Sequence, residues 1–198
     1  MSAHEPTTNR RRSRALWWSV GVLSTVILVA LLVVAIWLSN ALNPRQETPM
    51  NPDRTAALES ELRAKDSAED TLSRYEQALA QTADHVTALV PGLTWRWNRD
   101  STTVSCGGEL KDTQGVQILT RHVLFDGPIP DSAWSAALDV VRNQASQLGA
   151  QELLVFIDKP ADHDVAINGD NGVEVRFGTK VAATLSARSD CHLRRADY

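Results

Sequence analysis

The sequence has 198 residues, of which 43% are hydrophobic and 22% are charged, and its formal net charge is −4. This composition excludes collagen-like, wholly disordered and disulfide-dense proteins. The charge is uneven: residues 1–14 hold four arginines and one glutamate, whereas residues 39–198 hold 16 Lys and Arg against 23 Asp and Glu. An acidic part of this size lacks the basic patch that phosphates require, so we expect no nucleic acid as a partner.

Residues 15–38 form an uncharged stretch between these two parts. As a helix they would extend about 36 Å, enough for a hydrocarbon core of about 30 Å, so they predict a transmembrane anchor with the lipid bilayer as partner. Trp17 and Trp18 at one edge and Trp37 at the other are typical of an interfacial aromatic belt. The preceding arginines predict a cytoplasmic N-terminus and an extracytoplasmic C-terminal part, on the periplasm or cell-wall side of the plasma membrane.

A cleaved signal peptide is the alternative interpretation of this stretch. The apolar cores of signal peptides usually run 7–15 residues, and this one is longer. Ser39-Asn40-Ala41 provides a small-x-small cleavage site. We expect an uncleaved anchor. No cysteine lies near the segment, so it offers no residue for lipid modification.

The rest of the chain divides into a linker, a helical stalk and a domain. Three prolines in residues 39–52 indicate a linker. Residues 53–90 contain no helix breaker, but before residue 70 only Leu58 and Leu62 form an apolar face, so that half is expected to be a solvated stalk. The predicted parts are a cytoplasmic basic tail at 1–14, an anchor at 15–38, a linker and stalk at 39–69, and an extracytoplasmic α+β domain at 70–198.

Within the domain, apolar spacing predicts helices at 70–90 and 131–149. Short alternating runs at 94–98 and 102–106 predict a hairpin, and 116–125 a longer strand. The remaining expected strands are Leu153–Ile157, apolar throughout and so placed centrally, a hairpin of 165–168 with 173–177 around Gly169-Asp170-Asn171-Gly172, and 181–186. This order predicts an α+β fold with two helices packed on a mainly antiparallel sheet of about five to six strands, preceded by a transmembrane helix and helical stalk.

Cys106 and Cys191 are the two cysteines, and both lie in the expected extracytoplasmic part, where disulfides persist. We predict that they pair, stabilising the domain by about 4–5 kcal/mol in the chain-entropy model. A redox or metal site is the alternative, but no CxxC spacing and no His/Cys cluster supports it. We therefore expect neither a metal nor a cofactor.

The run from Asp158 to Asp164 is the main candidate for chemistry, because His163 lies between aspartates after a predicted strand. A histidine oriented by Asp158 or Asp164 can act as a general base or bind a metal. A solvated polar turn is the interpretation we favour. A Ser105, His163 and Asp158 triad can also be assembled, but the sequence has no G-x-S-x-G, H-E-x-x-H, G-x-G-x-x-G or P-loop spacing.

Trp95 and Trp97 alternate with polar residues, which places both indoles on one face of a strand. Two such rings can form a stacking platform for a sugar or a lipid. More often they fill a core beneath helices, and we favour that interpretation here.

Several short motifs together resemble the LppA-like lipoproteins of mycobacteria and related actinobacteria, over roughly residues 70–193. They are Pro91-Gly92-Leu93-Thr94-Trp95-Arg96-Trp97-Asn98-Arg99-Asp100, Cys106 with Gly108, Gly127-Pro128-Ile129-Pro130-Asp131 with Trp134, Gly149-Ala150, Asp158-Lys159-Pro160 with His163-Asp164-Val165, and Cys191. The resemblance implies an extracytoplasmic, membrane-attached envelope domain, and it brings no activity or catalytic residue. The sequence departs from the family at the lipidated cysteine, where it has the predicted transmembrane helix instead.

These observations favour a non-catalytic binding or interaction module of the cell envelope, whose partner is an envelope protein, lipid or glycan. The alternative is an envelope enzyme that uses the loop at 158–164. A third hypothesis is a structural role, with assembly through the helical residues 53–90.

Overall fold

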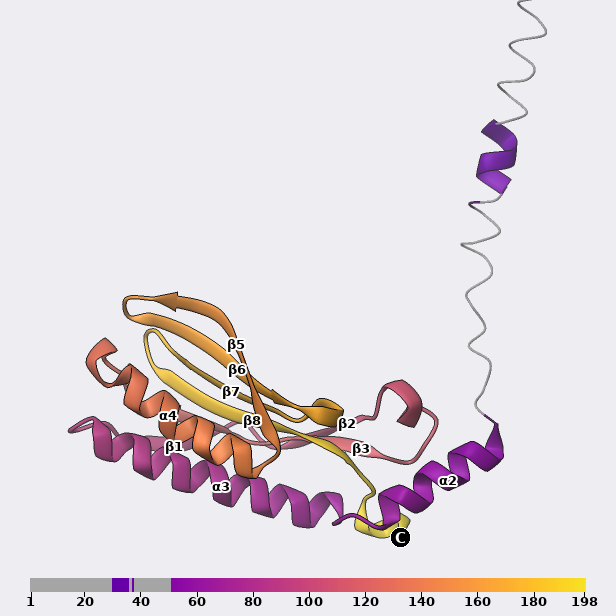
Figure 1. Ribbon diagram of the computed structural model, residues 1–198, viewed down its shortest axis with the longest axis horizontal. Helices are drawn as coiled ribbons and strands as arrows, with labels where there is room; N and C mark the ends of the chain where they lie inside the picture. Colours follow the sequence, from indigo (N-terminus) through magenta and orange to yellow (C-terminus); the bar gives the residue numbers. More distant parts are fainter. Residues whose placement is uncertain (1–29, 36, 38–50) are drawn as a thin grey trace, which may run out of the picture. The chain divides into compact units, whose positions relative to one another are not determined.

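The computed structural model describes residues 30–35, 37 and 51–198 (Figure 1). Its contacts divide the chain into two units, Met1–Thr48 and Pro49–Tyr198, and the second contains the sheet. Of the expected anchor at 15–38, Trp17 and Trp18 lie outside the described residues, while Trp37 is helical and 76% exposed. Among the described residues, no helix is both long enough and apolar enough to cross a membrane. This finding corrects the expected transmembrane helix.

The second unit contains three α-helices and eight strands. They are α2 (Pro52–Arg63), α3 (Ala68–Leu89), β1 (Trp95–Asn98), β2 (Thr102–Ser105), β3 (Val116–Leu119), β4 (His122–Phe125), α4 (Asp131–Gln147), β5 (Ala150–Lys159), β6 (Asp162–Gly169), β7 (Glu174–Thr179) and β8 (Ala183–His192). The prediction of two helices on five to six strands was therefore wrong. All eight strands form one antiparallel sheet, and helical structure extends beyond α3 and α4 to α2 and residues 30–35 and 37.

The strand order is β1-β4-β8-β7-β6-β5, with β3 also pairing with β8 and with β2. In Figure 1, α3 and α4 run side by side along one face of this sheet. Alternate strand residues point toward the helices, and the apolar spacing of both helices faces them. The largest fully buried side chains of this core include Phe125, Phe177, Ile167, Leu185, Leu79, Val86 and Val141.

The helical segment after residue 52 packs on the domain instead of standing away from it as a stalk. Leu62 of α2 is buried against the disulfide that joins Cys106 to Cys191, together with Leu193. The chain then breaks before α3, where the Ser67 hydroxyl accepts a hydrogen bond from the N–H of Asp70. The sequence Ser-Ala-Glu-Asp at this point is an N-cap signal that predicts the break. The expected solvated stalk is thus corrected.

The first four strands do not pair as expected. β1 and β2 do not form a hairpin with each other: β1 pairs with β4, and β2 pairs with β3. Between β1 and β2, Arg99 adopts a left-handed backbone conformation with φ of 64°. Between β3 and β4, Thr120 exchanges hydrogen bonds with the backbone of Ala187 on β8. Residues 95–105 and 116–125 therefore form one long antiparallel ladder, which is interrupted between β1 and β2 and between β3 and β4. The chain reverses direction in the connection through residues 106–115, between β2 and β3.

The apolar strand β5 lies at the edge of the sheet, not at its centre. A continuous apolar run usually indicates burial on both faces. Here β5 pairs only with β6 among the described strands, and Leu154, Val155 and Phe156 are 45%, 50% and 49% exposed. The meander β5-β6-β7-β8 is a chain of consecutive hairpins, so the first strand of the meander is left on the outside.

Candidate functional site

The imidazole of His163 is held between two carboxylates. The β5–β6 pairing sets His163 opposite Asp158, whose Oδ1 lies 2.8 Å from the imidazole Nδ1. The imidazole Nε2 lies 3.0 Å from Oδ1 of Asp131, the first residue of α4. That carboxylate also accepts a hydrogen bond from the N–H of Ala161. This bond, with a smaller contribution from His163, lowers the pKa of Asp131 below its usual value.

The same imidazole is part of an aromatic stack inside the domain. It lies flat on the indole of Trp134, which also stacks with Phe177, with centroid distances of 4.5 and 5.0 Å. His163 is 8% exposed. A general base or a metal ligand needs a ring nitrogen open to its target. Both nitrogens of His163 face carboxylates and one ring face is covered, so the arrangement ties β6 to α4 and to the end of β5.

The structure brings together only part of the predicted catalytic set. Asp158 does reach His163, but Asp164 points elsewhere and forms a bidentate pair with Arg176, at 3.0 and 2.6 Å. Ser105 lies on β2 and is not among the contacts of His163. The second carboxylate at His163 comes from Asp131 and not from Asp164. No local signal predicts this contact, because residue 131 is expected only to cap its own helix.

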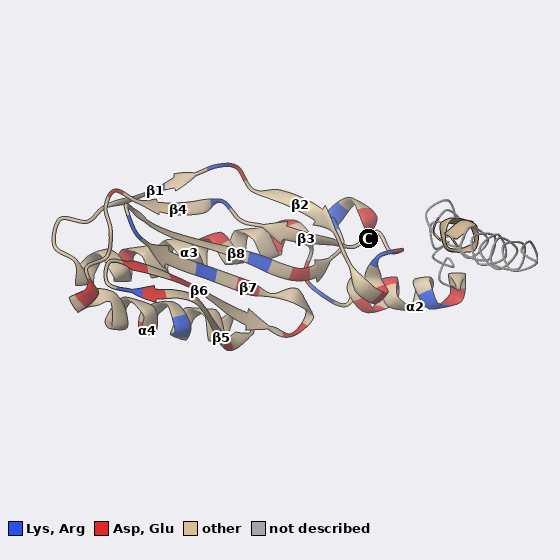
Figure 2. Ribbon diagram, turned by 90° about the horizontal axis from the view of Figure 1, so that it is seen from above, with Lys and Arg blue, Asp and Glu red and all other residues tan. Residues whose placement is uncertain are grey.

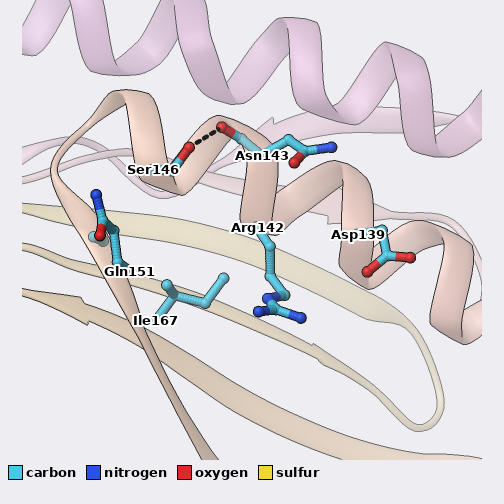
Figure 3. Close-up of a pocket in the computed structure, with 7 residues that line it drawn as sticks. Asp139, Arg142, Asn143, Ser146, Gln151 and Ile167 are labelled. Carbon is cyan, nitrogen blue, oxygen red and sulfur yellow. Dashed lines mark hydrogen bonds between the residues drawn. The ribbon is translucent and has the colours of Figure 1, made fainter.

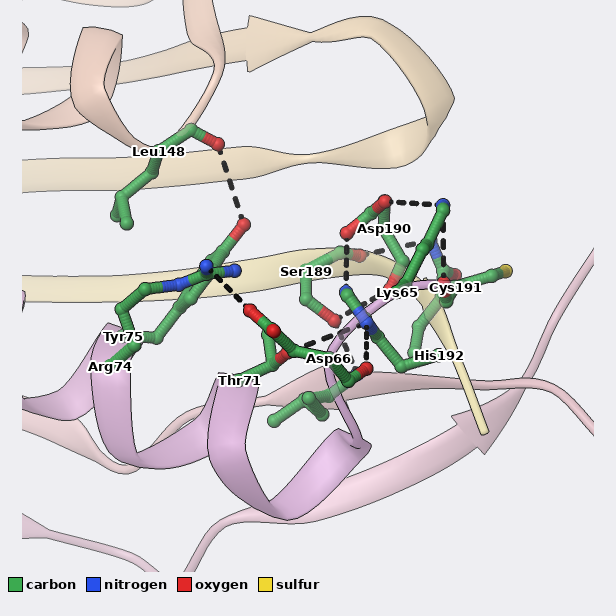
Figure 4. Close-up of polar contacts among 12 residues, drawn as sticks. Lys65, Asp66, Thr71, Arg74, Tyr75, Leu148, Ser189, Asp190, Cys191 and His192 are labelled. Carbon is green, nitrogen blue, oxygen red and sulfur yellow. Dashed lines mark hydrogen bonds and ion pairs between the residues drawn. The ribbon is translucent and has the colours of Figure 1, made fainter. Parts of the chain in front are cut away.

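A second histidine cluster, around His192, was missed by sequence reasoning (Figure 4). The imidazole Nε2 lies 2.6 Å from Oδ1 of Asp190, and Nδ1 lies 2.9 Å from the backbone oxygen of Asp66 and 3.3 Å from the hydroxyl of Thr71. Lys65 donates a 2.8 Å hydrogen bond to the other carboxylate oxygen of Asp190. The cluster therefore joins the α2–α3 junction to the end of β8.

The electrostatics of this second cluster favour an ionised Asp190. Burial by itself raises the pKa of this carboxyl, but hydrogen bonds from His192 and Lys65 outweigh it and lower the pKa to about 2. The hydroxyl, imidazole and carboxylate of Thr71, His192 and Asp190 resemble a nucleophile, base and orienting acid. Thr71 is fully buried, however, and His192 is nearly so, which leaves no approach for a substrate. The hydrogen bonds of this cluster hold the α2–α3 junction against the end of β8.

The two tryptophans proposed as a ligand platform are engaged by the protein itself. Trp95 and Trp97 are partly buried, pack against the main core and contact each other edge to face, with centroids 5.3 Å apart. The indole N–H of Trp95 donates to Asp84 of α3 at 2.7 Å. The guanidinium of Arg121 lies over the ring of Trp97, 4.3 Å from its centroid. These contacts agree with a packing role.

The outer edge of β5 carries a run of three consecutive exposed apolar residues, Leu154, Val155 and Phe156. Its three exposed apolar residues are flanked by exposed Glu152, Asp158 and Lys159, and the ring of Phe156 is covered on one side by the guanidinium of Arg176 at 4.6 Å. Figure 2 shows basic and acidic residues interspersed along the neighbouring strands. Exposed apolar surface rimmed by charge is typical of a protein interaction site.

A hollow of about 480 Å³ opens beside the start of this strand, between α4 and the sheet (Figure 3). Its lining is mostly polar: Asp139, Arg142, Asn143, Ser146, Ala150, Gln151 and Ile167. No lining residue belongs to either histidine cluster. Within residues 30–35, 37 and 51–198, no group of three or more His, Cys, Asp or Glu residues is placed to hold a metal ion. Both cysteines are in the predicted disulfide.

The sequence profile of the LppA family, described as a lipoprotein confined to pathogenic Mycobacterium, matches residues 43–195. The chain belongs to this family. Two proteins of Mycobacterium tuberculosis (strain ATCC 25618 / H37Rv) are similar to it. LppB is 28% identical over 180 residues, covering 84% of this chain and 80% of LppB, and LppA is 29% identical over 157 residues, covering 76% of this chain and 71% of LppA.

Two solved structures share the fold. The crystal structure of LppA from Mycobacterium tuberculosis matches with a TM-score of 0.63 and 23% identity, over 71% of this chain and 86% of the other. A DUF4853 family protein from Actinomyces odontolyticus ATCC 17982 matches with a TM-score of 0.50 and 17% identity, over 66% and 71%. Family membership indicates a lipoprotein-type, membrane-associated protein of the cell envelope.

Proposed function

We propose that this chain is a non-catalytic interaction module on the extracytoplasmic side of the cell envelope, and that it binds a protein partner through the outer edge of β5. The observation that carries the proposal is the exposure of Leu154, Val155 and Phe156 on an edge strand. An edge strand presents unpaired backbone N–H and C=O groups, which an added strand satisfies, while exposed apolar side chains contribute binding energy.

The histidine clusters support a binding role over an enzymatic one. The loop at 158–164 was the candidate for catalysis, and its histidine is stacked, buried and bonded at both nitrogens. The binding of a partner strand does not require His163 or its carboxylate partners to take part in a reaction. It needs an accessible edge about as long as the ten residues of β5.

The test is site-specific photo-crosslinking in intact cells. A photoreactive amino acid replaces Leu154 on β5, and in a matched control it replaces Val104 on β2, which is 41% exposed on the opposite edge of the sheet. We expect a discrete crosslinked protein from position 154 and none from position 104. Equal crosslinking from both positions, or none from position 154, would contradict the proposal.

A further inference from the structure

The outer edge of β5 is self-complementary in charge. Glu152 lies near its start and Lys159 at its end, and both side chains are exposed. Neither takes part in an ion pair within the described part of the chain, although Asp162, which is bonded to Lys180, lies close enough to Lys159 to respond to its charge. Between the two charged ends, the strand is apolar from Leu153 to Ile157.

We propose that the strand bound at this edge is β5 of a second copy of the chain, antiparallel, with Glu152 of each copy opposite Lys159 of the other. The inference rests on the proposed function, because it names the partner of the same edge. Because the two copies are related by a two-fold axis, the contact between Glu152 and Lys159 occurs twice in this register. Opposite charges placed directly across a strand pair are favourable, and like charges are not.

A β-bulge in β5 makes this register sterically consistent. Residues seven apart on a regular strand point to opposite faces of the sheet. In β5, however, the register shifts between Val155 and Ile157, so Glu152 opposes Asn168 of β6 and Lys159 opposes Asp162. Asn168 and Asp162 are an even number apart on β6, so Glu152 and Lys159 share one face. Both therefore meet their counterparts on the same side of the joined sheets.

The same register brings apolar residues together at the centre of the contact. Leu154 of one copy lies opposite Ile157 of the other, and the two share a face because they oppose Ala166 and Asp164, which are an even number apart on β6. Pro160 of the other copy follows its Lys159 and so comes opposite Gln151, which lines the hollow of about 480 Å³ beside the start of β5. An apolar centre with a charged rim is the usual organisation of a protein interface.

Cysteine crosslinking of the full chain in detergent tests the register. In the double variant Glu152→Cys with Lys159→Cys, the two new thiols are too far apart along one strand to bond within a copy, but they are adjacent between copies. The native cysteines are already paired. We expect disulfide-linked dimers from the double variant and monomers from each single variant. Equal dimer formation by a single variant, or by Leu154→Cys, would overturn the register.

Charge exchange provides a second test that needs no new bond. We expect Glu152→Lys or Lys159→Glu alone to raise the dissociation constant of the dimer about tenfold or more, measured by sedimentation. The double variant with both substitutions should restore it to within about twofold of the original. Failure of the double variant to recover, or a chain that is monomeric throughout, would overturn the proposal.

The crosslinked mass from position 154 separates this inference from the function on which it rests. A product of twice the chain mass supports a second copy. A product of another mass overturns the second copy and leaves the binding function standing, whereas no product contradicts both.

Discussion

The ring of His163 lies parallel to the ring of Trp134, with planes 8° apart and centroids at 4.5 Å. The residue with the most suggestive sequence context for catalysis is therefore part of the wall of the core. The two aspartates considered as its orienting partners have separate contacts, since Asp158 binds the imidazole and Asp164 binds Arg176. The groups that are accessible for binding are instead the backbone edge and the exposed apolar side chains of β5.

Replacing His163 with alanine should destabilise the domain by about 1–3 kcal/mol, because it removes a ring stack and two hydrogen bonds to carboxylates. The free energy of unfolding, measured by urea titration with tryptophan fluorescence, checks this. The control is His85→Ala on the exposed face of α3, expected to change stability by less than about 0.5 kcal/mol. Equal stability of both variants would show that the stack contributes nothing.

Acid should weaken the domain partly through Asp190. Its folded-state pKa of about 2 is below the ordinary value of 3.8, so its stabilising contribution is present above about pH 4 and is lost as the pH falls toward 2. The shift corresponds to about 2 kcal/mol. Unfolding free energies from pH 2 to 5 should therefore fall less steeply for Asp190→Asn than for the unmodified chain. The exposed Asp100→Asn serves as control, and parallel curves for Asp190→Asn would refute the assignment.

Removing the disulfide should destabilise the domain by about 2–5 kcal/mol, since the Cys106–Cys191 link joins positions 85 residues apart. The double variant Cys106→Ala with Cys191→Ala is compared with the unmodified chain by thermal unfolding, with and without reductant. Reductant should lower the melting temperature of the unmodified chain only. A melting temperature of the double variant equal to that of the oxidised chain would contradict this expectation.

Gly169→Ala should destabilise the domain by about 1–3 kcal/mol through overpacking. A Cβ at this end of β6 would collide with the carbonyl oxygen of Gly149 and lie 2.8 Å from its carbon, and both are backbone atoms that cannot rotate away. Gly107→Ala is the matched control, because a Cβ there meets nothing within 4 Å. Chemical denaturation of the two variants separates steric collision from a general effect of replacing glycine. Similar losses in both would refute the mechanism.

Local sequence patterns predicted the helices and turns whose determining residues lie within a single short segment of the chain. The Gly169-Asp170-Asn171-Gly172 turn places positive φ at Asn171 and Gly172, which reverses the chain and pairs β6 with β7 as expected. The apolar spacing that includes Trp134 and Val141 likewise predicted α4. The break at Ser67 was predictable from its capping residues but was hidden by the helix-forming composition of residues 53–90. Asp131 beside His163 was not predictable, because the contact joins two elements 32 residues apart.

The sequence by itself determined the family, the disulfide partners and most of the segments that become helices and strands, because composition, spacing and turn residues act within a few positions of each other. Tertiary structure decided which strands pair, that the apolar β5 lies at an edge, and that His163 and His192 are enclosed. These outcomes depend on hydrogen bonds and packing between distant segments. The exposed edge of β5, which carries the proposed function, arises from strand order, and strand order is a property of the assembled sheet.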